Sequence, residues 1–301
     1  MSKVKIDLLA DWTEIQLREL TNMGYAVGAA DTPEQISLAF YNVQRREILP
    51  RRRTVHQSRE LTCPSAHRAG LNVVFKKAAR GQDLRPHQST RLAQADYNDA
   101  LLNDWRIQHF HLGSIPYPKM PKFVARTGPV LFAYVAEGDF FAIDVMTHND
   151  FARQRLLEIV HRNWPDLIER HRLKGVLAKE AKCSDDDVKR VRIGHVVTTT
   201  EIDGIVYAPP GGGYSSSGTS IEVGLQHDHA YRTFSNIEKY ISEHIDQIVE
   251  NARQRGRTMV PPFNFQLHLV CPDRIEVKEM NSATIFPFPI TLTLGGHVWR
   301  Q

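Results

Sequence analysis

The hydrophobic and polar positions along the chain predict helices that surround a small antiparallel sheet near the middle. Apolar residues recur at helical spacing in three early stretches: residues 3–24, 31–46 and 65–80. Three strand-like runs follow: residues 106–112, 129–136 and 140–147. The last two are joined by Glu137-Gly-Asp139, which is typical of a tight hairpin turn. The pattern therefore predicts an α+β fold organised around this sheet.

The second half of the chain mixes helical and strand-like patterns. A helix is expected from His148, with Asp150 as its N-cap, to Trp164, and a charged helical stretch covers residues 166–190. Further strands are expected at residues 191–200, 205–208, 220–225, 263–270, 274–278 and 284–298, with a long helix at 234–254. The proline-containing stretch 113–128 is expected to be a long basic loop.

These elements suggest three segments. They are an N-terminal helical segment with a basic arm at 1–64, an α+β domain at 65–183 and a C-terminal α+β module at 184–301.

Composition narrows the class of protein. The 301 residues carry a formal net charge of +4, a mild basic bias that is compatible with nucleic acid but does not require it. The three cysteines are far apart, so neither a disulfide framework nor a Cys-rich zinc site is expected. No apolar run reaches the ~18–20 residues of a membrane span. We therefore expect a cytoplasmic protein that is not inserted in a membrane.

The first strand of the central sheet carries two histidines one residue apart, in Ile107-Gln-His-Phe-His-Leu112. Side chains alternate across a strand, so His109 and His111 share a face with Ile107, while Phe110 and Leu112 share the other. This alternation predicts that one face builds the core and the other is available for chemistry.

The order of elements over residues 70–150 resembles the small toxin fold of the RelE, YafQ and BrnT type. The matching pieces are the strand Arg106–Leu112, the hairpin Val130–Val145, and His148 directly after the last strand. This resemblance implies a sheet with helices against it, active-site residues that project from the sheet, and endoribonuclease activity on free or ribosome-bound RNA. It also implies a cognate antitoxin or self-association. The long stretch 113–128 and the segments on both sides depart from the simplest members of that fold.

RNA cleavage without a metal needs a base, an acid and cations, and the sequence offers candidates for each. Histidine suits both proton-transfer roles, so His109, His111 and His148 are the candidate catalytic residues. The candidate cations for the RNA phosphate are Arg106, Lys119, Lys122 and Arg126, together with Arg51, Arg52 and Arg53 of the basic arm. The arm is also typical of a solvated loop, or of arginines that pair with carboxylates of the protein itself.

Other interpretations of these residues stay open. No cofactor is required by the acid–base hypothesis, but a zinc ion held by His109, His111, His148 and His161 would make a metal-dependent hydrolase. A third possibility is a non-catalytic module that binds nucleic acid or protein. His161 is also interpreted as a helix-terminating residue, and His227-x-His229 is expected to lie in a connection before the long helix.

Overall fold

The chain folds into two units of mixed α and β structure. The computed structural model describes residues 4–28, 30–176, 183–290 and 299–300. Contacts divide these residues into a first unit of residues 1–44, 94–96 and 223–301 and a second unit of residues 45–93 and 97–222. The α+β class is confirmed, because both units combine helices with mixed or antiparallel sheets. Among the described helices, none is long and apolar enough to cross a membrane.

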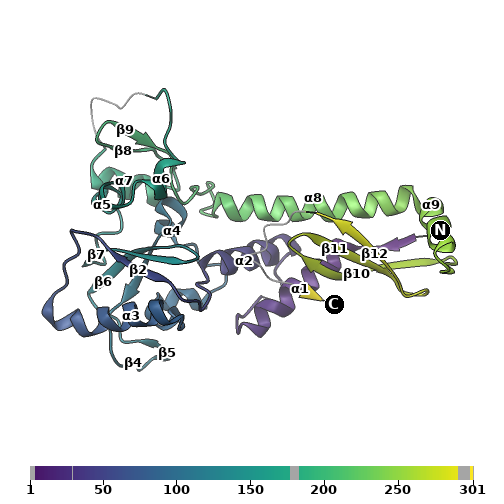
Figure 1. Cartoon of the computed structure of the whole chain (residues 1–301), viewed down its shortest axis with the longest axis horizontal. Helices are drawn as coiled ribbons and strands as arrows, with labels where there is room; N and C mark the ends of the chain where they lie inside the picture. The colour runs from purple at the N-terminus through teal and green to yellow at the C-terminus, as the bar shows by residue number, and fades with distance from the viewer. Residues whose placement is uncertain (1–3, 29, 177–182, 291–298, 301) are drawn as a thin grey trace. The chain divides into compact units, whose positions relative to one another are not determined.

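The second unit is built on a four-stranded sheet with the strand order β2-β7-β6-β3 (Figure 1). Its strands are β2 (Thr54–Gln57), β3 (Ile107–His111), β6 (Pro129–Val135) and β7 (Asp139–Thr147). Strand β2 is parallel to β7, and the other two pairings are antiparallel. The predicted central strands and the hairpin between β6 and β7 are therefore confirmed.

Each face of this sheet packs into its own hydrophobic core. Ile107 and Phe132 join the core that includes α5 (Arg155–Asn163), whereas Phe110 and Leu131 join the core that includes α3 (Arg68–Arg80). The contact with α3 is close: a Cβ atom on Gly70 would lie 1.9 Å from the carbonyl oxygen of Leu112. Only glycine leaves room for the chain at this crossing.

Short elements complete the second unit around these two cores. The 3₁₀ helices are η1 (Ser65–His67), η2 (Arg85–His87) and η3 (Thr90–Ala93). The short α-helices are α4 (Ala100–Trp105), α6 (Asp166–Glu169) and α7 (Asp185–Ile193). Two small hairpins pair β4 (Pro116–Tyr117) with β5 (Met120–Val124) and β8 (Thr200–Ile202) with β9 (Ile205–Tyr207).

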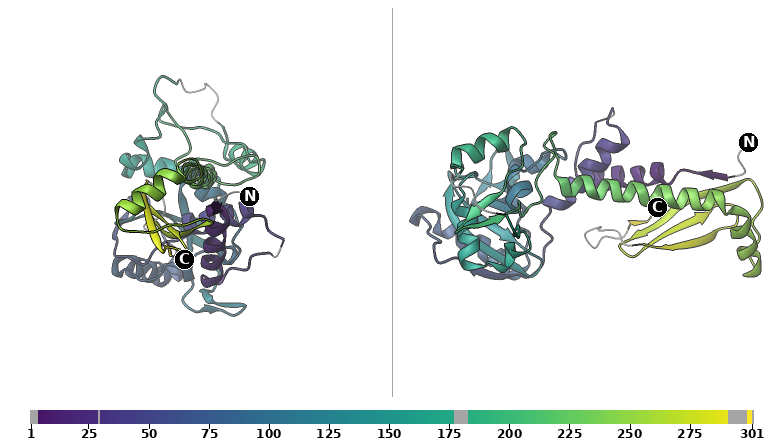
Figure 2. Two further views of the ribbon diagram at one scale, coloured as in Figure 1. Left: turned by 90° about the vertical axis from the view of Figure 1, so that its right-hand side faces the viewer. Right: turned by 90° about the horizontal axis from the view of Figure 1, so that it is seen from above.

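The first unit joins both ends of the chain in one sheet with the order β1-β10-β11-β12, and β13 also pairs with β10. Its strands are β1 (Val4–Ile6), β10 (Phe263–Cys271), β11 (Arg274–Glu279), β12 (Thr284–Pro289) and β13 (Trp299–Arg300). Its helices are α1 (Leu8–Asn22), α2 (Pro33–Arg46), α8 (Ile221–Glu243) and α9 (Ile245–Gln254), of which α2 and α8 each extend a few residues into the second unit. Figure 2 shows α1 beside α8 in this unit, where Glu238 accepts a hydrogen bond from the Leu8 backbone N–H.

The pairing of distant segments gives units that differ from the three predicted segments. The predicted boundaries after residues 64 and 183 both fall inside the second unit. Strand β1 runs parallel to β10, with Val4 opposite Phe263, and this joins the N-terminal segment to the C-terminal one. Local patterns along the chain carry no information about such a pairing.

Several predicted elements are wrong in type or extent. Residues 220–225 start helix α8 rather than a strand, so His227 and His229 lie on a helix and not in a connection. The expected loop 113–128 contains the β4–β5 hairpin. Asp150 lies in a turn, and the helix begins only at Arg155. In place of the helix expected at 166–190, the structure has the two shorter helices α6 and α7. Helix α7 extends to Ile193, and the strand expected at 191–200 begins only at Thr200.

Two predictions fall partly on residues that are not described. Residues 177–182 of the charged stretch and residues 291–298 of the predicted tail strand lie outside the described residues. The described part of the tail is a strand as predicted, because β12 covers Thr284–Pro289. At the N-terminus, the helix predicted over 3–24 is represented by strand β1 followed by helix α1, whose first turn is capped by Asp7.

Candidate functional site

Three histidines, which we call the histidine trio, come together at one end of the central sheet: His109, His111 and His148. The ring centroids of His109 and His111 are 5.9 Å apart, those of His109 and His148 are 5.7 Å apart, and those of His111 and His148 are 4.9 Å apart. His111 pairs with Val130 of β6, whose other neighbour is the final part of β7. The residue after β7 is His148, so the sheet register itself brings the third imidazole to the first two.

The trio is buried and is not part of an open face. His109 is 7% exposed and His111 is 1% exposed, while His148 is half-buried. The ring of Phe151 covers the trio, with its centroid 4.8 Å from that of His109 and 5.5 Å from that of His148. The expectation that one face of β3 is left available is therefore wrong, because every residue of this strand is buried. The apolar core that begins at Ile107 continues over the histidines.

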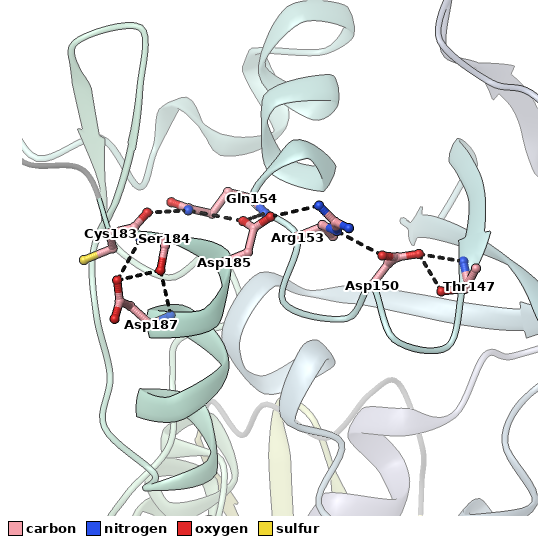
Figure 3. Close-up of polar contacts among 8 residues, drawn as sticks. All are labelled: Thr147, Asp150, Arg153, Gln154, Cys183, Ser184, Asp185 and Asp187. Atoms are coloured by element: carbon pink, nitrogen blue, oxygen red, sulfur yellow. Dashed lines mark hydrogen bonds and ion pairs between the residues drawn. The ribbon is translucent and has the colours of Figure 1, made fainter.

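A polar network holds the turn that follows His148 and covers the trio, residues 149–154, which we call the covering turn. Figure 3 shows this network between β7 and α7. Asp150 accepts hydrogen bonds from the Thr147 backbone N–H at 2.8 Å and from the Arg153 Nε at 3.0 Å. Arg153 also pairs with Asp185 at the start of α7, over 3.5 Å. The covering turn is thus tied at both ends by charged hydrogen bonds.

Electrostatics at Asp150 agree with this geometry. Burial would raise the pKa of its carboxyl group, but the hydrogen bonds from Thr147 and Arg153 outweigh burial and hold that pKa below its usual range. Asp150 is therefore ionised at neutral pH and remains a strong acceptor for both donors.

A buried ion pair supports the covering turn from α7. The Arg192 guanidinium donates to Asp104 Oδ2 from Nε at 3.0 Å and from Nη2 at 2.6 Å, and it also donates to the backbone carbonyl of Phe151. Its Cζ lies 4.3 Å from the ring centroid of Trp105, a cation–π contact. Sequence reasoning missed this pair, because a separation of 88 positions between its members leaves no local signal.

The tautomer of His111 is fixed by its neighbours. The Thr127 backbone N–H donates to His111 Nδ1 over 3.1 Å, so Nδ1 uses its lone pair and the proton of the neutral ring is on Nε2. The backbone carbonyl of His111 accepts from His87 Nδ1 at 2.9 Å, which holds the strand at this point. His111 therefore presents a neutral N–H donor on the side of the ring opposite Thr127.

Three buried ring nitrogens of the trio have no hydrogen-bond partner among the described residues: His109 Nδ1, His111 Nε2 and His148 Nε2. An unpaired buried polar atom typically costs about 1–3 kcal/mol, and native proteins keep few of them. Three such atoms in one cluster are therefore available to hydrogen-bond water or a bound group.

The trio is neutral at physiological pH. Burial lowers the pKa of His109 to about 3, and the charges of His148 and Arg126 add to the effect. Burial also lowers the pKa of His111 to about 3, with contributions from His109 and Arg126. The pKa of the half-buried His148 is lowered by the same two causes, burial and Arg126. In the free protein, the imidazoles are therefore weak bases that can accept or donate neutral hydrogen bonds.

The predicted cations are divided between two ends of the sheet. Arg126 is near the trio and donates a hydrogen bond to Thr90 at 2.9 Å. Lys119 and Lys122 are exposed on the β4–β5 hairpin, which precedes Arg126. Among the seven predicted phosphate contacts, Arg126 is therefore the one with an electrostatic link to the trio.

The other four predicted cations lie toward the β6–β7 turn. Arg53 is buried and donates to the Ala136 carbonyl, and Arg51 pairs with Glu137. Arg52 precedes Arg53 in the chain and is exposed. Arg106 directly precedes β3, at the opposite end of the strand from His111. Its guanidinium Nη1 lies 3.9 Å from the carboxylate Oε2 of Glu222. Arg51 therefore agrees with the alternative that arginines of the arm pair with carboxylates of the protein itself, whereas Arg53 donates to backbone carbonyls.

The described residues do not form a set of ligands for the zinc alternative. Among the described residues, no group of three or more His, Cys, Asp or Glu residues is arranged to hold a metal ion. In the trio, His111 Nδ1 already accepts a hydrogen bond, whereas a metal-binding histidine usually donates from its second nitrogen. The fourth proposed ligand, His161, hydrogen-bonds Tyr207 at 3.0 Å and approaches Asp203 to 3.9 Å.

Comparison of the chain with protein-family models, with curated proteins and with solved structures gives no match. The resemblance to the RelE-type fold therefore depends on the order of the elements alone. Function has to be argued from the chemistry of the trio and its surroundings.

Proposed function

We propose that this protein is a cytoplasmic endoribonuclease of the RelE-like toxin or defence type, with the histidine trio as its catalytic site. One observation carries the proposal: two imidazoles of β3 and the imidazole of the residue after β7 converge with unpartnered buried nitrogens, and the charge of Arg126 acts on all three. The order of α3, β3, β6 and β7 agrees with the element pattern of that fold.

The proposed reaction is an internal transesterification of RNA. His109, neutral and with a free Nδ1, takes the proton of a 2′-hydroxyl, and the resulting oxygen attacks the adjacent phosphorus. The bond from phosphorus to the 5′-oxygen breaks, and His148 gives its proton to that oxygen. The products are a 2′,3′-cyclic phosphate and a 5′-hydroxyl. His111 Nε2–H and Arg126 stabilise the phosphoryl oxygens, on which negative charge builds up.

The lowered pKa values set the order in which protons are acquired. Burial and the charge of Arg126 lower the pKa of His148 below its usual value, so this imidazole is mainly neutral in the free enzyme at pH 7 and gains its proton when the substrate binds. A phosphodiester anion beside the trio raises the pKa of each imidazole, because an opposite charge favours the protonated form. His148 is the best placed for this role because it is the most exposed of the three.

Access to the trio requires movement of the covering turn. His109 and His111 are almost fully buried, and Phe151 lies directly over His109. RNA therefore reaches the site past His148 after the covering turn shifts. Such loop movements are common in enzymes that close over their substrates.

The test is RNA cleavage by the purified chain and by single variants. His109→Ala and His148→Ala should each lower the cleavage rate by at least about 100-fold, the usual contribution of general acid–base catalysis. His111→Ala should lower it by about 100-fold or more, the usual contribution of a hydrogen-bond donor to the developing negative charge. His67→Gln, which lies outside the trio, is the matched control and should cleave at the wild-type rate. Circular dichroism spectra of all variants establish that they are folded. Wild-type cleavage rates in the three trio variants would contradict the proposal.

The burial of His109 and His111 favours one second candidate, a module that has kept the sheet without the chemistry. In that case the exposed Lys119, Lys122 and Arg126 would bind nucleic acid, and the trio would only pack the core. RNA binding without cleavage, unchanged by His148→Ala and weakened by Lys122→Gln, would select this candidate.

A further inference from the structure

A row of positive charge lies on helix α3, which packs against the face of the central sheet opposite the histidine trio. The 13 residues of this helix include four lysines and arginines and no aspartate or glutamate. One of the four, Lys77, donates to the backbone carbonyl of Asp83 at 3.2 Å. The other three, Arg68, Lys76 and Arg80, are exposed, and we call them the α3 row.

The α3 row follows the solvent side of the helix. Lys76 is eight residues after Arg68, and Arg80 follows four residues later. At 1.5 Å per residue, the row therefore extends over about 18 Å along the helix axis. The exposed positions between the three cations are small or uncharged: Ala69, Asn72, Val73 and Ala79. The row is thus a line of positive charge fixed on a regular helix.

No carboxylate in the described part of the chain neutralises the α3 row. Arg68, Lys76 and Arg80 make no ion pair or hydrogen bond through their side chains with any described residue. The acidic residue nearest to the row along the chain is Asp83, whose carboxylate accepts from the Arg85 backbone N–H at 2.8 Å. Arg68 is in the first turn of α3, where the helix dipole disfavours a cation. A bound anion would offset this repulsion.

Positive charge is concentrated in the unit that carries the trio. The sequence of the second unit holds 27 lysines and arginines against 19 aspartates and glutamates, a net charge of +8. The first unit holds 11 against 15, a net charge of −4. The mild basic bias of the whole chain therefore hides a strongly basic unit, which attracts polyanions.

The α3 row starts at the end of the sheet where the trio lies. Gly70, two residues after Arg68, crosses the backbone carbonyl of Leu112, directly after the strand that carries two histidines of the trio. The other end of α3 lies beside the basic arm, because a Cβ atom on Gly81 would be 2.7 Å from the backbone nitrogen of Arg52. The Arg52 side chain is exposed and extends the positive charge. A polyanion along α3 would thus start beside the trio end of β3.

We propose that the α3 row binds the phosphate backbone of a double-helical part of a structured RNA. The inference rests on the proposed function and names its substrate class: an RNA whose duplex lies on α3 and whose unpaired strand reaches the trio. Cations fixed in a row contact phosphates without reading bases.

The absence of stacking side chains favours a duplex over a single strand. Proteins that hold unpaired RNA stack its bases on exposed aromatic rings. Among the described residues of the second unit, no phenylalanine, tyrosine or tryptophan is exposed. Duplex RNA is recognised mainly by its shape and its phosphates, which the α3 row can contact.

The probe is a labelled 2′-O-methyl RNA duplex of about 20 base pairs, longer than the row. The methyl group removes the proton of the 2′-hydroxyl, so the probe stays intact whether or not the protein cleaves RNA. Fluorescence anisotropy with the full chain should show saturable binding that weakens steeply with added salt.

Two triple variants locate the binding. Arg68→Gln/Lys76→Gln/Arg80→Gln should weaken it at least about tenfold, because each exposed ion pair changes affinity by about two- to threefold. The slope of log affinity against log salt should also fall by about 2–3, roughly 0.9 for each lost phosphate contact. The control, in which the exposed Lys239, Arg253 and Arg257 of the first unit are all changed to Gln, removes the same charge and should leave affinity and slope unchanged.

Four results would overturn the inference. The first is an equal loss in the two triple variants, which would reflect net charge alone, and the second is an unchanged affinity in the α3 variant. The third is binding of the single strand as tight as that of the duplex, or tighter binding of a DNA duplex of the same sequence. The fourth is binding of phosphatidylserine vesicles without binding of the duplex.

The outcome is separate from that of the proposed function. Duplex binding that depends on the α3 row, in a chain that cleaves no RNA, would contradict the proposed function and leave this inference standing. Cleavage of a structured RNA with an unchanged KM in the α3 variant would contradict this inference alone.

Discussion

The burial of His109 makes a quantitative prediction about acid stability. Its imidazole has a usual pKa of 6.5, and burial lowers that pKa to about 3 in the folded chain. Between these two values the unfolded chain binds a proton that the folded chain does not. Stability therefore falls as the pH falls from about 6.5 toward 3. Each pH unit below 6.5 lowers the free energy of unfolding by about 1.36 kcal/mol for one such histidine. At pH 5 the free energy of unfolding is therefore about 2 kcal/mol lower than at pH 7.5.

The variant His109→Gln removes this proton and keeps a polar side chain. Its free energy of unfolding at pH 7.5 should be lower than that of the wild-type protein, because the packing against Phe151 changes. Its further loss between pH 7.5 and pH 5 should be smaller than the wild-type loss by about 2 kcal/mol. The pH-dependent difference is thus separated from the effect of the substitution on packing.

The assay is urea unfolding of both proteins at the two pH values, followed by circular dichroism. His67→Gln is the control and should show the wild-type loss between pH 7.5 and pH 5. An equal pH-dependent loss in His109→Gln and the wild-type protein would refute the reasoning, because it would mean that His109 is not held neutral in the folded chain.

Two further predictions concern the groups that hold the covering turn. Arg192→Met leaves Asp104 buried without its partner, and the free energy of unfolding at pH 7.5 should fall by about 3–5 kcal/mol in urea denaturation; adding Asp104→Asn should restore part of it. Burial raises the pKa of Asp104 against the pull of Arg192, so the loss should shrink at low pH, where that carboxyl is protonated. Asp150→Asn weakens the bonds to Thr147 and Arg153, and hydrogen exchange in residues 147–154 should become faster, with about 1 kcal/mol less protection; unchanged exchange there would contradict the role given to Asp150.

Strand periodicity was enough to place two members of the trio. The alternation in Ile107-Gln-His-Phe-His predicts that His109 and His111 share a face, and their rings are indeed neighbours. His148 was expected to join them if the third strand neighboured the first. Strand β6 in fact separates β7 from β3, and His148 reaches the pair because β7 returns along β6, so the end of β7 lies beside the start of β6. These are short-range relations, which a single sequence records well.

Burial of the trio depends on long-range contacts that the sequence does not show. Phe151 covers His109 because the covering turn is tied to α7, and α7 is tied to Asp104 by Arg192. The strand predicted at 220–225 was wrong for a related reason. Six alternating residues imitate a strand, whereas Val223 belongs to the helical series that continues through Ala230 and Phe234 into a buried core.

The central claim is that the histidine trio cleaves RNA, with His148 as the acid. The most direct measurement is the single-turnover rate of RNA cleavage by the wild-type and His148→Ala proteins between pH 5.5 and pH 8.5. We expect that the wild-type rate falls as the pH rises through the pKa of His148 in the complex, that the products end in 2′,3′-cyclic phosphate, and that His148→Ala loses both the rate and its pH dependence. No cleavage by the wild-type protein, or equal rates in the two proteins across this range, would contradict it.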